Sequence, residues 1–261
     1  MMRQNQPGKA HPSVIILILS LLFIQPGTGL AFETITFPSQ DGLLITADLY
    51  QPHPKTAPFL LLFHRAGWSR GEYREIAPKL NELGFNCLAI DQRSGKGVLN
   101  VTNETAEQAE KKRLPTTYID ALQDMEAAFL YTRKNLTQGK LILWGSSYSA
   151  SLVLVLANNH SAEVNGILAF APGEYFAKLG RSETYIADHV DMIQCPVFIT
   201  SAQPEKERWW PIFQAIPSRQ KEFFLPKTFG IHGSQALWQS TSEHKEYWQA
   251  VKNFLFNNSF R

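Results

Sequence analysis

Apolar residues recur along this chain in short runs of the length expected for buried strands. Two alternating runs, 33–37 and 43–50, flank the Asp41-Gly42 pair, a pattern typical of a β-hairpin. Continuous apolar runs then predict further strands at 58–64, 87–91, 141–144, 166–171, 197–201 and 222–225. Segments with helical periodicity separate or follow these runs at 72–83, 118–134, 149–157 and 243–256.

This alternation predicts the architecture. Continuous apolar strands separated by helices indicate a mostly parallel sheet with helices on both faces, and the opening hairpin adds an antiparallel edge. The 261 residues suffice for one large core, and no repeat or linker divides the chain. Loops that carry active sites in such sheets leave the carboxyl ends of the strands. His64, Asp91, Ser147 and the loop after Ser201 all lie at such ends.

The first 31 residues have the features of a secretory signal peptide. Arg3 and Lys9 precede the apolar run 14–24, and small residues before the end of Gly29-Leu30-Ala31 suit cleavage after Ala31. An uncleaved anchor is the alternative, but the run is shorter than the roughly 20 residues of a membrane span. We therefore predict a signal peptide at 1–31, one domain at 32–261, and export to the periplasm or the exterior of the cell.

Charge and cysteine content exclude several classes of protein. The formal charge of +2 comes from the first 31 residues, because the remaining 23 basic residues equal the 23 acidic ones. The domain therefore has no signature of a nucleic-acid surface or a polybasic membrane patch. Cys87 and Cys195 lie in separate strand-like segments, as two free thiols or, in an exported chain, a disulfide. No Cys/His ligand spacing is present, and we expect neither a metal nor a cofactor.

Residues 145–149, with the sequence Gly-Ser-Ser-Tyr-Ser, carry the strongest indication of function. They follow a predicted strand and precede a predicted helix, the context in which a G-x-S-x-G-like motif is typical of a nucleophile elbow. Such a turn needs small residues two positions before and after the nucleophile. Gly145 satisfies this, and Ser149 replaces the usual second glycine with one added hydroxymethyl group. We predict Ser147 as the nucleophile, with a plain strand–helix connection as the alternative.

A serine nucleophile needs a histidine base that a carboxylate orients. In this architecture the order along the chain is serine, acid, histidine. Among the histidines after Ser147, His232 lies between Gly230 and Gly233, in the loop between the last strand and the last helix. Glycine neighbours leave its backbone free to reach over the sheet edge. We predict His232 as the base.

The acid has several candidates. Glu205 is the first carboxylate after the strand at 197–201, and we favour it for that reason. Glu174, which follows the preceding strand, is the main alternative, and Glu207 is a further one.

An oxyanion hole requires two backbone N–H groups that point at the developing alkoxide. One is expected from Tyr148, the residue after the nucleophile. The other is expected from Ala66, in the loop after the strand at 58–64. We assign His64, at the start of that loop, a structural role.

Taken together, these motifs resemble those of α/β-hydrolases of the compact, dienelactone-hydrolase-like kind. The resemblance covers about residues 33–261 and is carried by the segments 64–67, 70–73, 91–95, 145–149 and 230–233. Membership implies an eight-stranded sheet, a Ser–acid–His triad and hydrolysis of a carboxylic ester or related acyl bond. The sequence departs from the pattern at Arg65, where a small or polar residue is usual, and at Ser149. It also carries Pro204 at the usual aspartate position, so that the acid falls one step later.

The predicted site is fairly open, because no insertion is long enough for a large lid and the segment 172–196 is modest. Trp68, Tyr175 and Trp209 lie on loops around Ser147. They predict either an aromatic-walled pocket for a small or aromatic ester or half-buried core aromatics.

The leading hypothesis is therefore an exported serine esterase that acts on a small-molecule ester. A small serine peptidase or an acyltransferase would use the same triad. A binding protein that kept the fold without catalysis is a third hypothesis, against which the Ser147 and His232 pair argues.

Cleavage of the signal peptide yields a mature protein that begins at Phe32. N-terminal sequencing of the protein from its native host checks this prediction. A mature chain that retains Met1 or Met2 would refute cleavage.

Overall fold

The computed structural model describes residues 1–2 and 32–260, so that all but the first two residues of the predicted signal peptide lie outside the described residues. An eight-stranded sheet forms the centre of the domain, in the order β1-β2-β4-β3-β7-β8-β9-β10. Its strands are β1 (Glu33–Pro38), β2 (Leu44–Tyr50), β3 (Phe59–Phe63), β4 (Asn86–Ile90), β7 (Leu141–Ser146), β8 (Gly166–Phe170), β9 (Val197–Thr200) and β10 (Lys221–Phe224).

Strand direction follows the prediction. β1 pairs with β2, and β2 with β4, in antiparallel register, whereas β4, β3, β7, β8, β9 and β10 pair in parallel. The predicted mostly parallel sheet with an antiparallel N-terminal hairpin is therefore confirmed. Because the six parallel strands point the same way, their carboxyl ends meet along one edge, where their loops gather.

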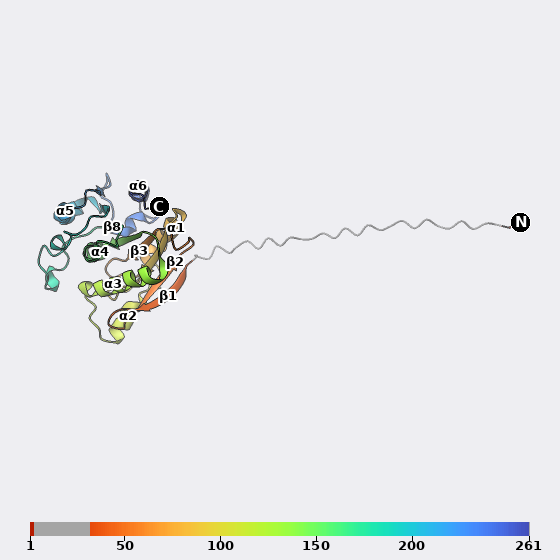
Figure 1. Cartoon of the computed structure of the whole chain (residues 1–261), viewed down its shortest axis with the longest axis horizontal. Coiled ribbons are helices and arrows are strands. Elements are labelled where there is room, and N and C mark those ends of the chain that lie inside the picture. Colours follow the sequence, from red (N-terminus) through yellow and green to blue (C-terminus); the bar gives the residue numbers. More distant parts are fainter. Residues whose placement is uncertain (3–31, 261) are drawn as a thin grey trace.

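Helices cover both faces of this sheet, as Figure 1 shows. One face packs against α3 (Leu122–Tyr131), α4 (Tyr148–Asn159) and α5 (Lys206–Ala215). The other packs against α1 (Ile76–Glu82) and α6 (His244–Asn257). α2 (Glu104–Lys111) lies beside β2 at the hairpin end.

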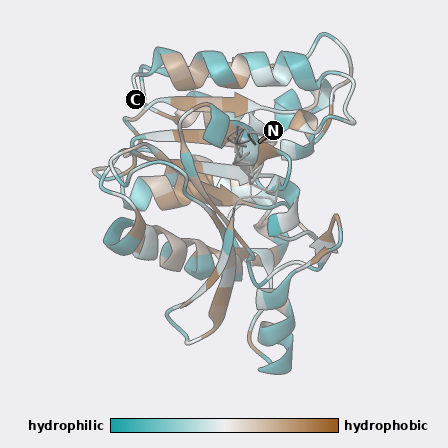
Figure 2. Cartoon of the chain, turned by 90° about the vertical axis from the view of Figure 1, so that its right-hand side faces the viewer, coloured by the Kyte–Doolittle hydropathy of each residue, from teal (hydrophilic) through white to brown (hydrophobic). Residues whose placement is uncertain are grey.

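The two cores follow from the alternation of side chains along each strand. Phe59, Leu61 and Phe63 of β3 face the α3–α4 layer, and Leu60 and Leu62 face the α1–α6 layer. All five are fully buried, which explains why the strand reads as a continuous apolar run. Figure 2 shows the apolar colouring concentrated on the strands between the helix layers and hydrophilic colouring on the outer surfaces.

The structure departs from the sequence prediction at the connections. The predicted helix 72–83 is divided into the 3₁₀ turn η1 (Arg70–Tyr73) and α1, and Pro78 lies in the first turn of α1, where its missing N–H is not needed. The segment 91–121 holds a small hairpin, β5 (Gly97–Val98) and β6 (Val101–Thr102), and helix α2, none of which was predicted. Helix α5, directly after Glu205, was also missed.

Neither long connection forms a large lid. The segment 171–196 contains only the short 3₁₀ turns η4 (Ala177–Leu179) and η5 (Ala187–His189), and the longest helix within 91–121 has 8 residues. The remaining short 3₁₀ turns are η2 (Tyr118–Ala121), η6 (Gln203–Glu205) and η7 (Ser234–Leu237), and the π-helical turn η3 (Thr132–Leu136) follows α3.

Both cysteines are free thiols, Cys87 on β4 and Cys195 just before β9.

In the described part of the chain, none of the helices combines the length and the apolar character that crossing a membrane requires.

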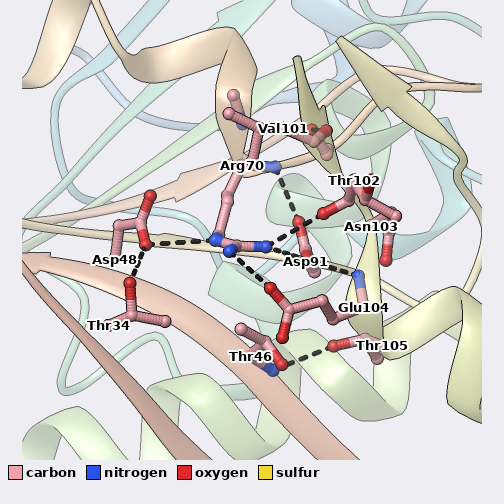
Figure 3. Close-up of polar contacts among 12 residues, drawn as sticks. Thr34, Thr46, Asp48, Arg70, Asp91, Val101, Thr102, Asn103, Glu104 and Thr105 are labelled. Atoms are coloured by element: carbon pink, nitrogen blue, oxygen red, sulfur yellow. Dashed lines mark hydrogen bonds and ion pairs between the residues drawn. The ribbon is translucent and has the colours of Figure 1, made fainter. Parts of the chain in front are cut away.

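A buried ion network fixes the turn at η1 to the sheet (Figure 3). The Arg70 guanidinium lies 3.1 Å from Asp48 on β2, 2.5 Å from Asp91 after β4, and 2.8 Å from Glu104 at the start of α2. Asp91 also accepts hydrogen bonds from the backbone N–H groups of Arg70 and Glu104. Although Arg70 opposes it, burial raises the pKa of Asp91 to about 6. The network therefore joins three segments through Arg70 and two buried carboxylates, Asp48 and Asp91, while Glu104 remains half exposed.

Removal of the cation should leave the buried Asp91 carboxylate without a charged partner, whereas Asp48 keeps its ion pair with Arg74. We expect Arg70→Met to lower the free energy of unfolding by about 3–5 kcal/mol, as for other broken buried ion pairs. Urea unfolding followed by circular dichroism measures this loss. Lys111→Met, which removes an exposed i,i+4 pair with Glu107, is the matched control and should change stability by less than about 0.5 kcal/mol. Equal effects of the two substitutions would contradict the prediction.

Candidate active site

Ser147 occupies a strained turn between β7 and α4. Its φ of 61° and ψ of −121° lie outside the regions that non-glycine residues favour, and its N–H donates to the Phe170 carbonyl at 2.7 Å. A Cβ at Gly145 would lie 2.3 Å from the Ser149 carbonyl oxygen, so that only glycine fits there. Ser147 keeps 8% of its surface exposed, which leaves it reachable from solvent. This is the geometry expected of a nucleophile elbow.

His232 meets Ser147 from the loop after β10. Its Nε2 lies 2.8 Å from Ser147 Oγ. Gly230 and Gly233 on either side have φ of 74° and 76°. A Cβ at Gly233 would come within 2.6 Å of Ser146 Oγ. The two glycines therefore allow the loop to bring the imidazole over the end of β7.

Glu205 completes a continuous chain of hydrogen bonds. Its Oε1 lies 2.6 Å from His232 Nδ1, and its Oε2 accepts from the Ala202 N–H at 3.2 Å. The turn η6, with Pro204 in its first positions, places Glu205 just beyond the end of β9. One carboxylate oxygen is thus anchored to the backbone while the other orients the imidazole.

The alternative acids lie elsewhere. Glu174 accepts hydrogen bonds from the Ile186 and Ala187 N–H groups at 2.8 and 2.9 Å, and so holds the start of η5 in place. Its carboxylate forms no hydrogen bond with His232. Glu207 is exposed on the first turn of α5. Of the three candidate carboxylates, the structure brings only Glu205 to the imidazole.

Two N–H groups near Ser147 are available to a ligand. Within the described residues, neither the Ala66 nor the Tyr148 N–H donates a hydrogen bond. Tyr148 is the first residue of α4, where backbone N–H groups have no partner inside the helix. These are the two groups that the sequence assigned to an oxyanion hole.

His64 and Ser149 hold the loop that carries Ala66. The His64 ring is fully buried; its Nδ1 lies 2.8 Å from the Arg65 carbonyl, and its Nε2 accepts from the Gln92 N–H at 3.0 Å. Ser149 Oγ donates to the His64 carbonyl at 2.5 Å and accepts from Gln92 Nε2 at 2.8 Å. The extra hydroxymethyl group of Ser149 therefore links the elbow to this loop, a contact that the motif alone does not reveal.

The predicted pocket residues have different positions. Tyr175 is half-buried close to Ser147, and burial, reinforced by the charge of Glu205, raises the pKa of its phenol to about 12. Trp68 is half-buried and stacks on Trp238 at 5.1 Å between ring centroids. Trp209 is fully buried, and its Nε1 donates to Ser201 Oγ at 2.8 Å. Assigning Trp209 to the pocket wall was therefore wrong, because the side chain packs inward from α5 into the core.

Two hollows lie among the loops of this edge. One, of about 360 Å³, opens beside the Glu205 and His232 pair and is bordered by Arg208. The other, of about 350 Å³, lies among Gly67, Ser94 and Tyr118, and the Tyr118 ring contacts Tyr148 at 4.8 Å between centroids.

In the part of the chain that the structure describes, no three His, Cys, Asp or Glu side chains gather as a metal site.

Such a chain of groups has a definite chemical capacity. A hydroxyl bonded to an imidazole, which a carboxylate orients, can lose its proton as it attacks an electrophilic carbon. Two free N–H groups beside it can bind the negative oxygen that results.

Comparisons with known proteins show a family match and a shared fold. The model of the family described as serine aminopeptidase, S33, matches residues 54–204, more than half of the chain, which include Ser147. A comparison with curated proteins found no match.

Solved structures share the fold at low sequence identity. The esterase Pf2001 of Pyrococcus furiosus aligns with a TM-score of 0.66 and 16% identity, over 87% of this chain and 92% of that one. Est1E of Butyrivibrio proteoclasticus, with ferulic acid bound, gives 0.68 and 14%, over 87% and 100%. A dienelactone hydrolase from Anabaena variabilis gives 0.65 and 15%, over 87% and 97%.

Proposed function

The chain belongs to the S33 serine aminopeptidase family of α/β-hydrolases and is a hydrolase, and from this premise we propose that it is an exported serine hydrolase that cleaves a carboxylic ester or related acyl bond. The observation that carries the proposal is the unbroken chain of hydrogen bonds from Ser147 through His232 to Glu205. It lies where the strands of this fold end and where active sites form.

The proposed reaction has two stages. In the first, His232 takes the proton of Ser147 as Oγ attacks the acyl carbon, and Glu205 stabilises the imidazolium. The Ala66 and Tyr148 N–H groups bind the oxyanion of the tetrahedral intermediate. His232 then protonates the leaving alcohol, and an acyl-enzyme remains. In the second stage, water deprotonated by His232 attacks this acyl group, the bond to Ser147 Oγ breaks as His232 returns the proton to Oγ, and the carboxylic acid leaves.

The charges near Ser147 favour an ester over a peptide with a free amino terminus. An aminopeptidase must bind a positive α-ammonium group, for which an unpaired carboxylate is the natural partner. Here the Glu205 carboxylate is bonded to His232 and Ala202, and two cations, Arg65 and Arg208, lie near Tyr175. Positive charge beside the nucleophile disfavours an ammonium substrate.

A hollow at the same edge of the sheet as Ser147, although Ser147 itself does not line it, supports a small-molecule substrate. The hollow beside Tyr118, of about 350 Å³, is at the lower end of the range typical of ligand pockets, and its wall includes Gly67 of the loop that carries Ala66. An ester with an aromatic or short acyl group fits a hollow of this volume. Ferulic acid, bound in the structure of Est1E, is an aromatic acid that such an ester would release. A peptidase or acyltransferase that used the same groups is the alternative. Export, proposed from the features of residues 1–31, would place the reaction outside the cytoplasm.

Loss of the nucleophile should abolish the activity while the fold remains. We expect Ser147→Ala to lower kcat by about 10⁴- to 10⁶-fold toward p-nitrophenyl esters and to abolish labelling by a fluorophosphonate probe. Ser182→Ala, at an exposed serine, is the control and should react as the wild type does. Absence of labelling in the wild type would favour a non-catalytic binding protein, and higher kcat/KM toward peptides in a parallel assay would favour a peptidase.

The contacts of the acids make a second prediction. Glu205→Gln should lower kcat by about 10⁴-fold at saturating substrate, because the orienting carboxylate is lost. Glu174→Gln should have a small effect, since that side chain holds only η5. Glu207→Gln, two residues after Glu205 on the first turn of α5 and exposed, is the control. The reverse order of the Glu205 and Glu174 effects would assign the acid to Glu174.

A further inference from the structure

Glu72 is a fully buried carboxylate that takes no part in the proposed chemistry, yet it lies directly behind the site. Its Oε2 accepts a hydrogen bond from the Arg65 N–H at 2.7 Å, and its Oε1 accepts one from Ser146 Oγ, also at 2.7 Å. Arg65 precedes Ala66, and Ser146 precedes Ser147. The Glu72 carboxylate therefore holds the residue before the proposed nucleophile, Ser147, and the residue before the proposed oxyanion donor, Ala66.

The same contacts extend to the loop of the base. Ser146 Oγ, while it donates to Glu72, accepts from the Ser234 N–H at 2.9 Å. Ser234 lies two residues after His232, and its hydroxyl accepts from Trp144 Nε1. The loop at 64–67 and the elbow are thus bonded directly to Glu72, and the loop at 230–234 is bonded to it through Ser146.

Glu72 can do this because its own backbone is held rigidly. Arg70, in the same turn, is held by the buried ion network of Figure 3. Tyr73 donates to the Phe63 carbonyl at 2.7 Å, and Trp238 Nε1 donates to the Glu72 carbonyl at 2.9 Å. The turn is therefore fixed to the sheet and to η7 independently of the Glu72 side chain.

We propose that Glu72 is a positioning residue for the hydrolase. Its side chain fixes the Arg65 amide and the Ser146 hydroxyl directly, and the Ser234 amide through Ser146. It thereby aligns the loop that carries the oxyanion donor, the nucleophile and the loop that carries the base. The proposal rests on the proposed function, because alignment has meaning only for a catalytic Ser147. With the Arg65 N–H bonded to Glu72, the next amide in the chain, that of Ala66, remains free to bind the oxyanion.

The protonation state of Glu72 makes this role sensitive to pH. Burial raises the pKa of Glu72 to about 7, against the hydrogen bonds from Ser146 and Arg65 and the charge of Arg65, which lower it. The charged or titratable groups that face it are Arg65 from the β3 loop and Tyr73 of its own turn, while β7 and the 230–236 loop present the neutral Ser146 and Ser234 groups. Both carboxylate oxygens accept hydrogen bonds, so the ionised form fits the arrangement and prevails above about pH 7.

Because the folded pKa lies above the ordinary value of 4.5, this group contributes most stability below pH 4.5 and less as the pH rises to about 7. Activity should follow the opposite course, since it needs the ionised form. A loss of activity below pH 7 therefore cannot be attributed to a loss of stability from Glu72.

The test is the pH dependence of kcat/KM for Glu72→Gln with a p-nitrophenyl ester. Gln keeps the size but cannot accept both hydrogen bonds, and a displacement of about 1 Å can cost about 10²-fold. We expect kcat to fall by about 10- to 100-fold with KM within about twofold, because the oxyanion contact forms in the transition state. At its acid end the wild-type profile should be steeper than that of the variant by one proton, because position 72 no longer titrates in Glu72→Gln.

Glu75→Gln is the matched control, since this carboxylate, one turn on, bonds only the Gln239 N–H at the surface, and it should keep the wild-type profile. If Glu72→Gln does not fold by circular dichroism, Ser146→Ala decides, because it removes the relay to Ser234 and should lower kcat by about tenfold with KM unchanged. An active wild type with unchanged kcat and slope in Glu72→Gln, or unchanged kcat in a folded Ser146→Ala, overturns the proposal. An inactive wild type overturns the proposed function itself.

Discussion

The left-handed backbone of Ser147 is the constraint on which the arrangement of the site depends. With φ at 61°, the chain reverses sharply from β7 into α4, and the hydroxyl stands above the sheet edge instead of within it. The reversal brings the Ser149 carbonyl so close to residue 145 that a side chain there has no room. The strain is sustained because β7 is buried between two parallel neighbours and α4 is apolar almost throughout, so that neither element can shift to relieve it.

Buried polar groups connect this rigid turn to the loops around it. His64, Glu72 and Ser149 have no contact with bulk water, and each uses its hydrogen bonds to hold backbone of the loop at 64–67. In a low-dielectric interior, an unsatisfied polar group is costly, so that such networks specify one conformation. A site of this kind is aligned before the substrate arrives, and the energy for alignment comes from folding.

Sequence patterns predicted those parts of the structure that depend on local chemistry. The strands β3, β7 and β8 were found because burial on both faces requires a continuous apolar run. Ser147 could be proposed from the sequence because a strained turn allows few residue types, and Glu205 because parallel strands bring their carboxyl ends together. Helix α5 and the β5–β6 hairpin were missed, since α5 is interrupted by Pro211 and each strand of the hairpin has only two residues.

The sequence by itself determined the order of elements, the elbow and the family resemblance, because periodicity and small-residue turns are properties of neighbouring positions. Only the tertiary structure brought Glu205 and not Glu174 to His232, buried Trp209 in the core, and joined Glu72 to Arg65 and Ser146. These outcomes depend on which buried groups meet across more than one loop. These long-range contacts are set by the packing of the whole sheet, and the pattern of neighbouring residues in the sequence does not predict them.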